Sequence, residues 1–190
     1  RFLKFATAAC FLPKVISAAT AKNPVPPVEL DFSREGIKVI PRSSWTSFLP
    51  AGVSLRHARS YDRLTVHHTG SDEPVFIKKD DDAVMSLQSV LRGHLERKFE
   101  DIGYHFIIDY TGRVWEGRHI RYEGVHVKGQ NESNIGISLF GNFEIQEPSG
   151  EQIDSTMRLI SGLRRIYNIK MHRIFGHRDL GKTLCPGNNL

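Results

Sequence analysis

The spacing of apolar and polar positions along the chain predicts a domain of short strands and two amphipathic helices. Residues 64–68 (Leu-Thr-Val-His-His) alternate in character and include β-branched side chains, which is typical of a strand. On such a strand His67 and His68 point to opposite faces. The turn composition of residues 109–112 (Asp-Tyr-Thr-Gly) predicts a hairpin. Its two strands are residues 104–108 and 113–116, and further strands are expected at 135–140 and 173–175.

Two longer segments have the spacing of helices. The first begins at the acidic residues 80–82 and ends near Phe99, with an apolar stripe made by Val84, Leu87, Leu91 and Leu95. The second begins with a capping box of Ser149 and Gln152, and its apolar face is made by Ile153, Met157, Ile160, Leu163 and Tyr167. Strands and helices alternate irregularly around the hairpin. We therefore expect an α/β fold: a single domain with a central mixed β-sheet flanked by helices.

The N-terminal segment differs in character from the rest. Residues 1–21 run from basic to apolar and end in Ala-Thr-Ala, a small-x-small sequence like the cleavage site of an export signal. The opening Arg-Phe-Leu-Lys resembles the end of a twin-arginine signal, so we expect a trimmed signal here. An amphipathic helix is the alternative, and Thr7 disfavours a lipid anchor on Cys10. Residues 22–36, with three prolines in 22–27, are expected to be a linker that leads into a domain at 37–190.

Composition narrows the class of protein. A chain of 190 residues with 39% hydrophobic and 25% charged residues is that of an ordinary globular domain. The net charge of +5 includes Arg1, Lys4 and Lys14, without which 23 basic residues face 21 acidic ones. Nucleic acid is therefore not an expected partner. Beyond residues 1–21 no stretch approaches the roughly 20 apolar residues of a membrane span, so no stable membrane insertion is expected after signal removal.

Three residues could together hold a metal ion. Cleavage after Ala21 would leave Cys185 as the one cysteine, and metal ligation is one reason for an unpaired thiol in an exported protein. His67 on its strand and His177, with seven residues between it and Cys185, supply two imidazoles. Each residue also has an ordinary explanation. His67 could be a half-buried strand histidine, His177 a salt-bridged surface residue, and Cys185 a small buried hydrophobe.

Six motifs that occur in order along the chain favour the metal site over these ordinary explanations. They are Val-His-His-Thr at 66–69, Gly-Tyr-His-Phe at 103–106, Val-Trp-Glu-Gly-Arg at 114–118, His126-x2-Gly129-x-Asn131, Asn-Ile-Gly-Ile-Ser at 134–138, and Gly-His-Arg-Asp at 176–179 before Cys-Pro-Gly at 185–187. Together they resemble the N-acetylmuramoyl-L-alanine amidases, a family that includes phage amidase-type lysozymes and animal peptidoglycan recognition proteins. The resemblance covers about residues 37–187.

The resemblance implies a function and a site. It implies one Zn²⁺ ion held by His67, His177 and Cys185, a catalytic Tyr104, and a substrate groove lined by His126 and Asn131, with Arg118 as a further candidate. The substrate would be peptidoglycan or a muropeptide, cut at the amide between N-acetylmuramic acid and L-alanine.

Two positions depart from the pattern of other members. Thr183 stands where phage enzymes have a lysine, so it would supply only a neutral hydrogen bond to the reacting oxygen. Ser138 stands where other relatives have a glutamate, so the burden of catalysis shifts to water activated by the metal and to Tyr104.

Two other functions are compatible with the same motifs. A recognition module would bind peptidoglycan without cutting it, as family members that lack the cysteine do. A structural zinc protein would use the metal to fasten its C-terminal loop, and it would require a fourth protein ligand. The presence of Cys185 and Tyr104 favours the enzyme.

Overall fold

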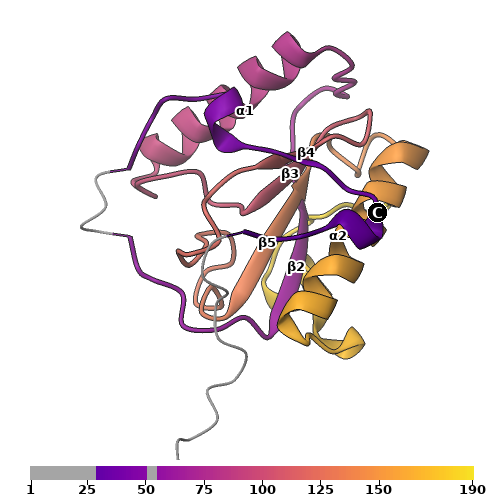
Figure 1. Ribbon diagram of the computed structural model, residues 1–190. Helices are drawn as coiled ribbons and strands as arrows, with labels where there is room; N and C mark the ends of the chain where they lie inside the picture. Colours follow the sequence, from indigo (N-terminus) through magenta and orange to yellow (C-terminus); the bar gives the residue numbers. More distant parts are fainter. Residues whose placement is uncertain (1–28, 51–54) are drawn as a thin grey trace, which may run out of the picture.

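A computed structural model describes residues 29–50 and 55–190 and contains a six-stranded mixed sheet between two helices (Figure 1). The strands are β1 (Val39–Ile40), β2 (Arg63–His68), β3 (Phe106–Ile108), β4 (Val114–Glu116), β5 (Asn134–Leu139) and β6 (Ile174–Gly176), in the order β1-β4-β3-β5-β2-β6. Only the β3–β4 hairpin is antiparallel among these strands. The α/β fold with one mixed sheet is thus confirmed. The expected export signal lies outside the described residues.

Each face of the sheet carries its own apolar core. Helix α1 (Asp80–Glu96) packs Leu87 and Leu91 against Ile107, Trp115 and other residues on one face. Helix α2 (Gly150–Tyr167) covers the opposite face, where Leu159 and Leu163 belong to a cluster with the inward side chains of β2, β3 and β5. Within the described residues, no helix is both long and apolar enough to cross a bilayer.

The apolar face expected for α2 is partly wrong. Ile153 and Met157 are 39% and 59% exposed, whereas Gln152 and Thr156 are buried together with Leu159. These two polar side chains can be buried because their hydrogen bonds are satisfied. The Gln152 amide donates to the Phe140 carbonyl at 2.9 Å while completing the predicted capping box with Ser149, and the Thr156 hydroxyl donates to the Gln152 carbonyl at 2.7 Å.

The packed domain begins before residue 37. Phe32 is 3% exposed and belongs to the core on the α2 side of the sheet. The 3₁₀ helix η1 (Ser33–Glu35) follows it, and the Glu35 carboxylate accepts two hydrogen bonds from Arg165 on α2. The expected domain boundary at residue 37 is therefore too late, because the chain packs against the domain from Leu30 onward, while residues 22–28 of the expected linker lie outside the described residues.

Candidate metal centre

Three donor atoms meet on the face of the sheet that carries α1. His67 lies near the end of β2, His177 is the first residue of the short helix α3 (His177–Leu180), and Cys185 follows in the C-terminal loop. One ligand atom from each lies within 4.8 Å of the other two. The His67 Nδ1 and Cys185 Sγ atoms are 3.6 Å apart. His67 and Cys185 are buried and His177 is half-buried, so the group is accessible from one side.

Strand pairing brings the two histidines together. In the parallel β2–β6 ladder Val66 pairs with Gly176, and the residue that follows each of them along the chain is a histidine. The two imidazole centroids are 4.6 Å apart. His68 faces away from the group, because its Nδ1 accepts a hydrogen bond from the Phe143 amide on the other side of the sheet. The alternation expected along this strand is therefore present.

The loop that carries Cys185 is fixed by backbone contacts. The thiol sulfur accepts a hydrogen bond from the His68 N–H at 3.4 Å, and the Cys185 N–H donates to the Thr183 hydroxyl oxygen at 3.1 Å. Gly187, at φ +104°, lies so close to Phe143 that an added Cβ atom would be 2.3 Å from the Phe143 carbonyl carbon. The side chain of Thr183 is exposed at the rim of the donor group.

The protonation states suit a cationic ligand. Burial holds the pKa of His67 well below its usual value, and the nearby His126 and His177 lower it further. Burial also lowers the pKa of His177, so both imidazoles are neutral at pH 7 and keep a free lone pair. Burial raises the pKa of the Cys185 thiol to about 11, so a bound cation is needed to stabilise its thiolate.

The donor set fits zinc. Two imidazole nitrogens and one thiolate are a known ligand set for catalytic Zn²⁺, which keeps a fourth position open. The group found in residues 29–50 and 55–190 consists of these three side chains and no fourth His, Cys, Asp or Glu. A structural zinc site, which is normally closed by four protein ligands, is therefore not supported in this part of the chain.

Tyr104 lies next to the donors. Its ring centroid is 5.1 Å from that of His67 and 5.3 Å from that of His94, a buried residue of α1 that the sequence did not single out. Burial raises the pKa of the Tyr104 phenol to about 12, with the neighbouring Cys185 adding to the effect. The phenol therefore remains a hydrogen-bond donor at neutral pH. Ser138 pairs with His67 across β2 and β5, and its hydroxyl lies close enough to the Tyr104 phenol to lower the pKa of that phenol, against the larger effect of burial.

The two expected groove residues near the donors take part in internal contacts. His126 is 3.0 Å from His67 through ring nitrogens. The side-chain oxygen of Asn131 accepts hydrogen bonds from the His126 and Val127 amides at 2.9 and 2.8 Å.

The guanidinium of Arg118 takes part in internal hydrogen bonds. It is 2% exposed, and its guanidinium donates to the carbonyl oxygens of Ile102, Glu123 and Phe99 at 2.8 to 2.9 Å. These bonds tie the segment after α1 to the loop after β4. Arg118 and Asn131 both line a hollow of about 420 Å³, and the role expected for Arg118 in the substrate groove stays a prediction.

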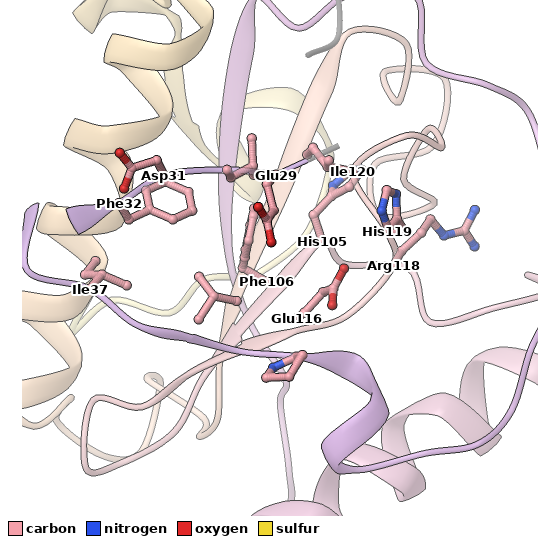
Figure 2. Close-up of a pocket in the computed structure, with 13 residues that line it drawn as sticks. Glu29, Asp31, Phe32, Ile37, His105, Phe106, Glu116, Arg118, His119 and Ile120 are labelled. Carbon is pink, nitrogen blue, oxygen red and sulfur yellow. The ribbon is translucent and has the colours of Figure 1, made fainter. Parts of the chain in front are cut away.

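A separate cavity of about 600 Å³ opens between the N-terminal segment and the β3–β4 hairpin (Figure 2). Phe32, Ile37 and Phe106 supply apolar walls, and the acidic Glu29 and Glu116 lie at its edge. The backbone of Arg118 borders it, but the guanidinium points away from the other labelled side chains (Figure 2). None of the three metal donors and no part of Tyr104 lines this cavity.

Comparison with known proteins places the chain in a family. Residues 57–188 match the family model described as N-acetylmuramoyl-L-alanine amidase. A peptidoglycan-recognition protein of Drosophila simulans is 31% identical over 157 residues, which cover 80% of this chain and 83% of that protein. The solved structure of the Drosophila peptidoglycan recognition protein SD superposes with a TM-score of 0.73 at 25% identity, covering 81% of this chain and 90% of that one.

A bacterial enzyme has the same fold. The endolysin N-acetylmuramoyl-L-alanine amidase LysCS of Clostridium intestinale superposes with a TM-score of 0.67 at 28% identity, covering 80% of this chain and 88% of that one. The chain therefore belongs to the N-acetylmuramoyl-L-alanine amidase family, and its relatives include amidases as well as peptidoglycan-recognition proteins.

Proposed function

We propose that this protein is a zinc-dependent N-acetylmuramoyl-L-alanine amidase that acts on peptidoglycan or muropeptides. The observation that carries the proposal is the meeting of His67, His177 and Cys185, with their ligand atoms within 4.8 Å, beside the protonated phenol of Tyr104. A protein that only recognises peptidoglycan has no need of a thiolate–imidazole donor set with an accessible side. The family match and the amidase fold neighbour are consistent with this reaction.

Each residue of the site has a separate role in this proposal. His67, His177 and Cys185 would hold the zinc ion, which acts as a Lewis acid on an amide carbonyl and makes water a stronger nucleophile at neutral pH. Tyr104 donates its phenolic proton in a hydrogen bond to the oxygen of the scissile amide as negative charge develops there. Thr183, exposed at the rim, adds a neutral hydrogen bond that helps position this oxygen. The bond that breaks joins the lactyl carbonyl to the nitrogen of L-alanine.

We also propose that the protein is exported, on the strength of the signal-like residues 1–21. Peptidoglycan lies outside the cytoplasmic membrane, so export would bring enzyme and substrate together. Fusing residues 1–21 to a reporter, with a twin-arginine pair supplied in front of them, tests this. A reporter retained in the cytoplasm would contradict the proposal.

Digestion of purified peptidoglycan tests the reaction directly. The zinc-loaded protein should release stem peptides with a new L-alanine amino terminus and leave glycan strands that carry free lactyl groups, both of which mass spectrometry detects. Removing zinc with a chelator should stop the release, and adding zinc back should restore it. If the loaded protein sediments with peptidoglycan but releases no peptide, it is a recognition module and the amidase proposal is wrong.

A further inference from the structure

The imidazole of His126, a partly buried residue, contacts the metal-site residue His67. The two rings meet through His67 Nε2 and His126 Nδ1, which are 3.0 Å apart. The other nitrogen of His67, Nδ1, is the one that lies 3.6 Å from the Cys185 sulfur. His67 therefore has one nitrogen on the metal side and one on the His126 side.

The far nitrogen of His126 decides the direction of this hydrogen bond. His126 Nε2 is 3.2 Å from the main-chain carbonyl oxygen of Asn134, a group that can only accept. Nε2 must therefore carry the hydrogen of the neutral ring, which leaves Nδ1 as an acceptor. The contact with His67 is then a hydrogen bond donated by His67 Nε2–H. As a consequence, the lone pair of His67 is on Nδ1, where it faces Cys185.

The surrounding chain holds the His126 ring in this position. An added Cβ atom on Gly136 would lie 2.7 Å from the ring and one on Gly124 would lie 2.5 Å from it, so the ring fits only because both residues are glycines. The Asn131 side chain fixes the backbone of the same loop through the amides of His126 and Val127. Several motif residues thus serve one purpose, which is to place this imidazole.

We propose that His126 is a positioning residue that selects the tautomer and orientation of His67 for metal binding. The inference rests on the proposed function, since it concerns the same metal. A hydrogen bond to the distal nitrogen of a ligand histidine fixes its ring and raises its basicity, and losing such a partner typically reduces metal affinity or activity by about 10- to 100-fold. Asn131, Asn134 and the two glycines act through His126.

Two substitutions at position 126 separate positioning from mere packing. His126→Leu fills the space without a polar atom, whereas His126→Asn places an amide oxygen near the position of Nδ1. The exposed His172, in the 3₁₀ helix η3 (Met171–Arg173) before β6, offers a matched control as His172→Leu. Zinc affinity is measured on the purified protein by competition with a chromophoric chelator. The cobalt-loaded forms are compared by their visible absorption, which reports ligand geometry.

We expect His126→Leu to bind zinc about 10- to 100-fold more weakly and to shift the cobalt spectrum, with His126→Asn recovering most of the affinity and His172→Leu unchanged. Wild-type affinity and spectrum in His126→Leu, with only the KM for muropeptide raised, would make His126 a substrate-groove residue and overturn the inference. An equal loss in both variants, with equally lowered melting temperatures of the metal-free proteins, would show a packing role and overturn it as well.

A third variant covers the case in which His126→Leu does not fold. His126→Gln carries its amide toward the Nε2 position and away from His67, so it should bind zinc more weakly than His126→Asn. Equal affinities in these two variants would overturn the inference. The measurement is independent of the amidase proposal, because a wild type that binds zinc without cutting peptidoglycan would refute that proposal while leaving the affinity comparison intact.

Discussion

Of the three expected metal ligands, Cys185 is the one that can be replaced by a residue of nearly the same shape, which is serine. In Cys185→Ser we expect zinc binding to be lost or severely weakened, because a serine hydroxyl is not ionised at neutral pH and cannot replace a thiolate. The hydroxyl can still accept the hydrogen bond from the His68 amide, so the loop should keep its path. Metal analysis of the purified variant measures the effect. Near-stoichiometric zinc together with full activity would remove Cys185 from the site.

The proposed role of Tyr104 rests on its hydroxyl and not on its ring. In Tyr104→Phe we expect zinc content and melting temperature to be retained while kcat falls about 10²- to 10³-fold, the usual effect of losing one hydrogen bond to a transition-state oxygen. KM should change little, because a contact made in the transition state alone does not affect ground-state binding. All four quantities are measured on one preparation, and a fully active variant would show that Tyr104 is only a packing residue.

Sequence motifs identify the chemistry at this scale but not the contacts that tune it. His67, His177, Cys185 and Tyr104 stand in short ordered motifs, and the structure brings them together. The hydrogen bond from His126 to Asn134 and the burial of the Arg118 guanidinium depend on loops folding back on the sheet. Side-chain type and spacing along one chain carry no information about such folding.

At the scale of elements, the helix α2 and the N-terminal segment show where a periodic pattern fails. The pattern counts apolar residues, so it misplaces the buried face of α2, in which Gln152 and Thr156 are buried by virtue of their hydrogen bonds. It also misses Phe32, because the glycine that admits its ring is Gly162, far along the chain. A Cβ atom on Gly162 would lie 2.5 Å from the Phe32 ring. Elements with strong local signals, such as β2 and α1, were predicted within a few residues.

The packing of Phe32 predicts that residues before 37 stabilise the domain. Phe32→Ala should lower the free energy of unfolding by about 3–5 kcal/mol, since it removes a buried aromatic ring and leaves a cavity. Phe76, which is 56% exposed, is the control, and Phe76→Ala should change stability by much less. Denaturant unfolding of the two variants measures the difference. Similar small effects in both would mean that the N-terminal segment is a linker after all.

At the scale of the whole molecule, buried neutral histidines make stability depend on pH. Burial lowers the pKa of His94 to about 4, with Arg97 and Arg118 contributing, and burial holds the pKa of His105 well below its usual value. In the unfolded chain both titrate near pH ~6.5. Between about pH 6.5 and 4 the unfolded state therefore binds more protons, and stability falls as pH falls. Each histidine contributes up to about 1.4 kcal/mol per pH unit, and above about pH 6.5 neither contributes.

Replacing one of these histidines isolates its contribution to the pH dependence of stability. The free energy of unfolding should decline less steeply between about pH 6 and pH 5 in His94→Gln than in wild type. The expected difference in slope is that of about one bound proton, roughly 1.4 kcal/mol per pH unit. Denaturant titrations in the presence of a chelator remove the contribution of bound metal. His172→Gln, at an exposed position, should decline like wild type. An unchanged slope in His94→Gln would show that His94 becomes protonated in the folded protein.

The position of β6 beside β2 has a consequence for biosynthesis. The strand that carries His67 is made early, whereas its edge partner and the segment with His177 and Cys185 are made more than 100 residues later. A nascent chain can pair β2 with β5 while it still offers a single metal-binding histidine of the three donors. Under the proposed function, zinc would therefore have to bind after translation of this segment. A ribosome-bound chain that lacks this segment would offer zinc only His67 of the three donors.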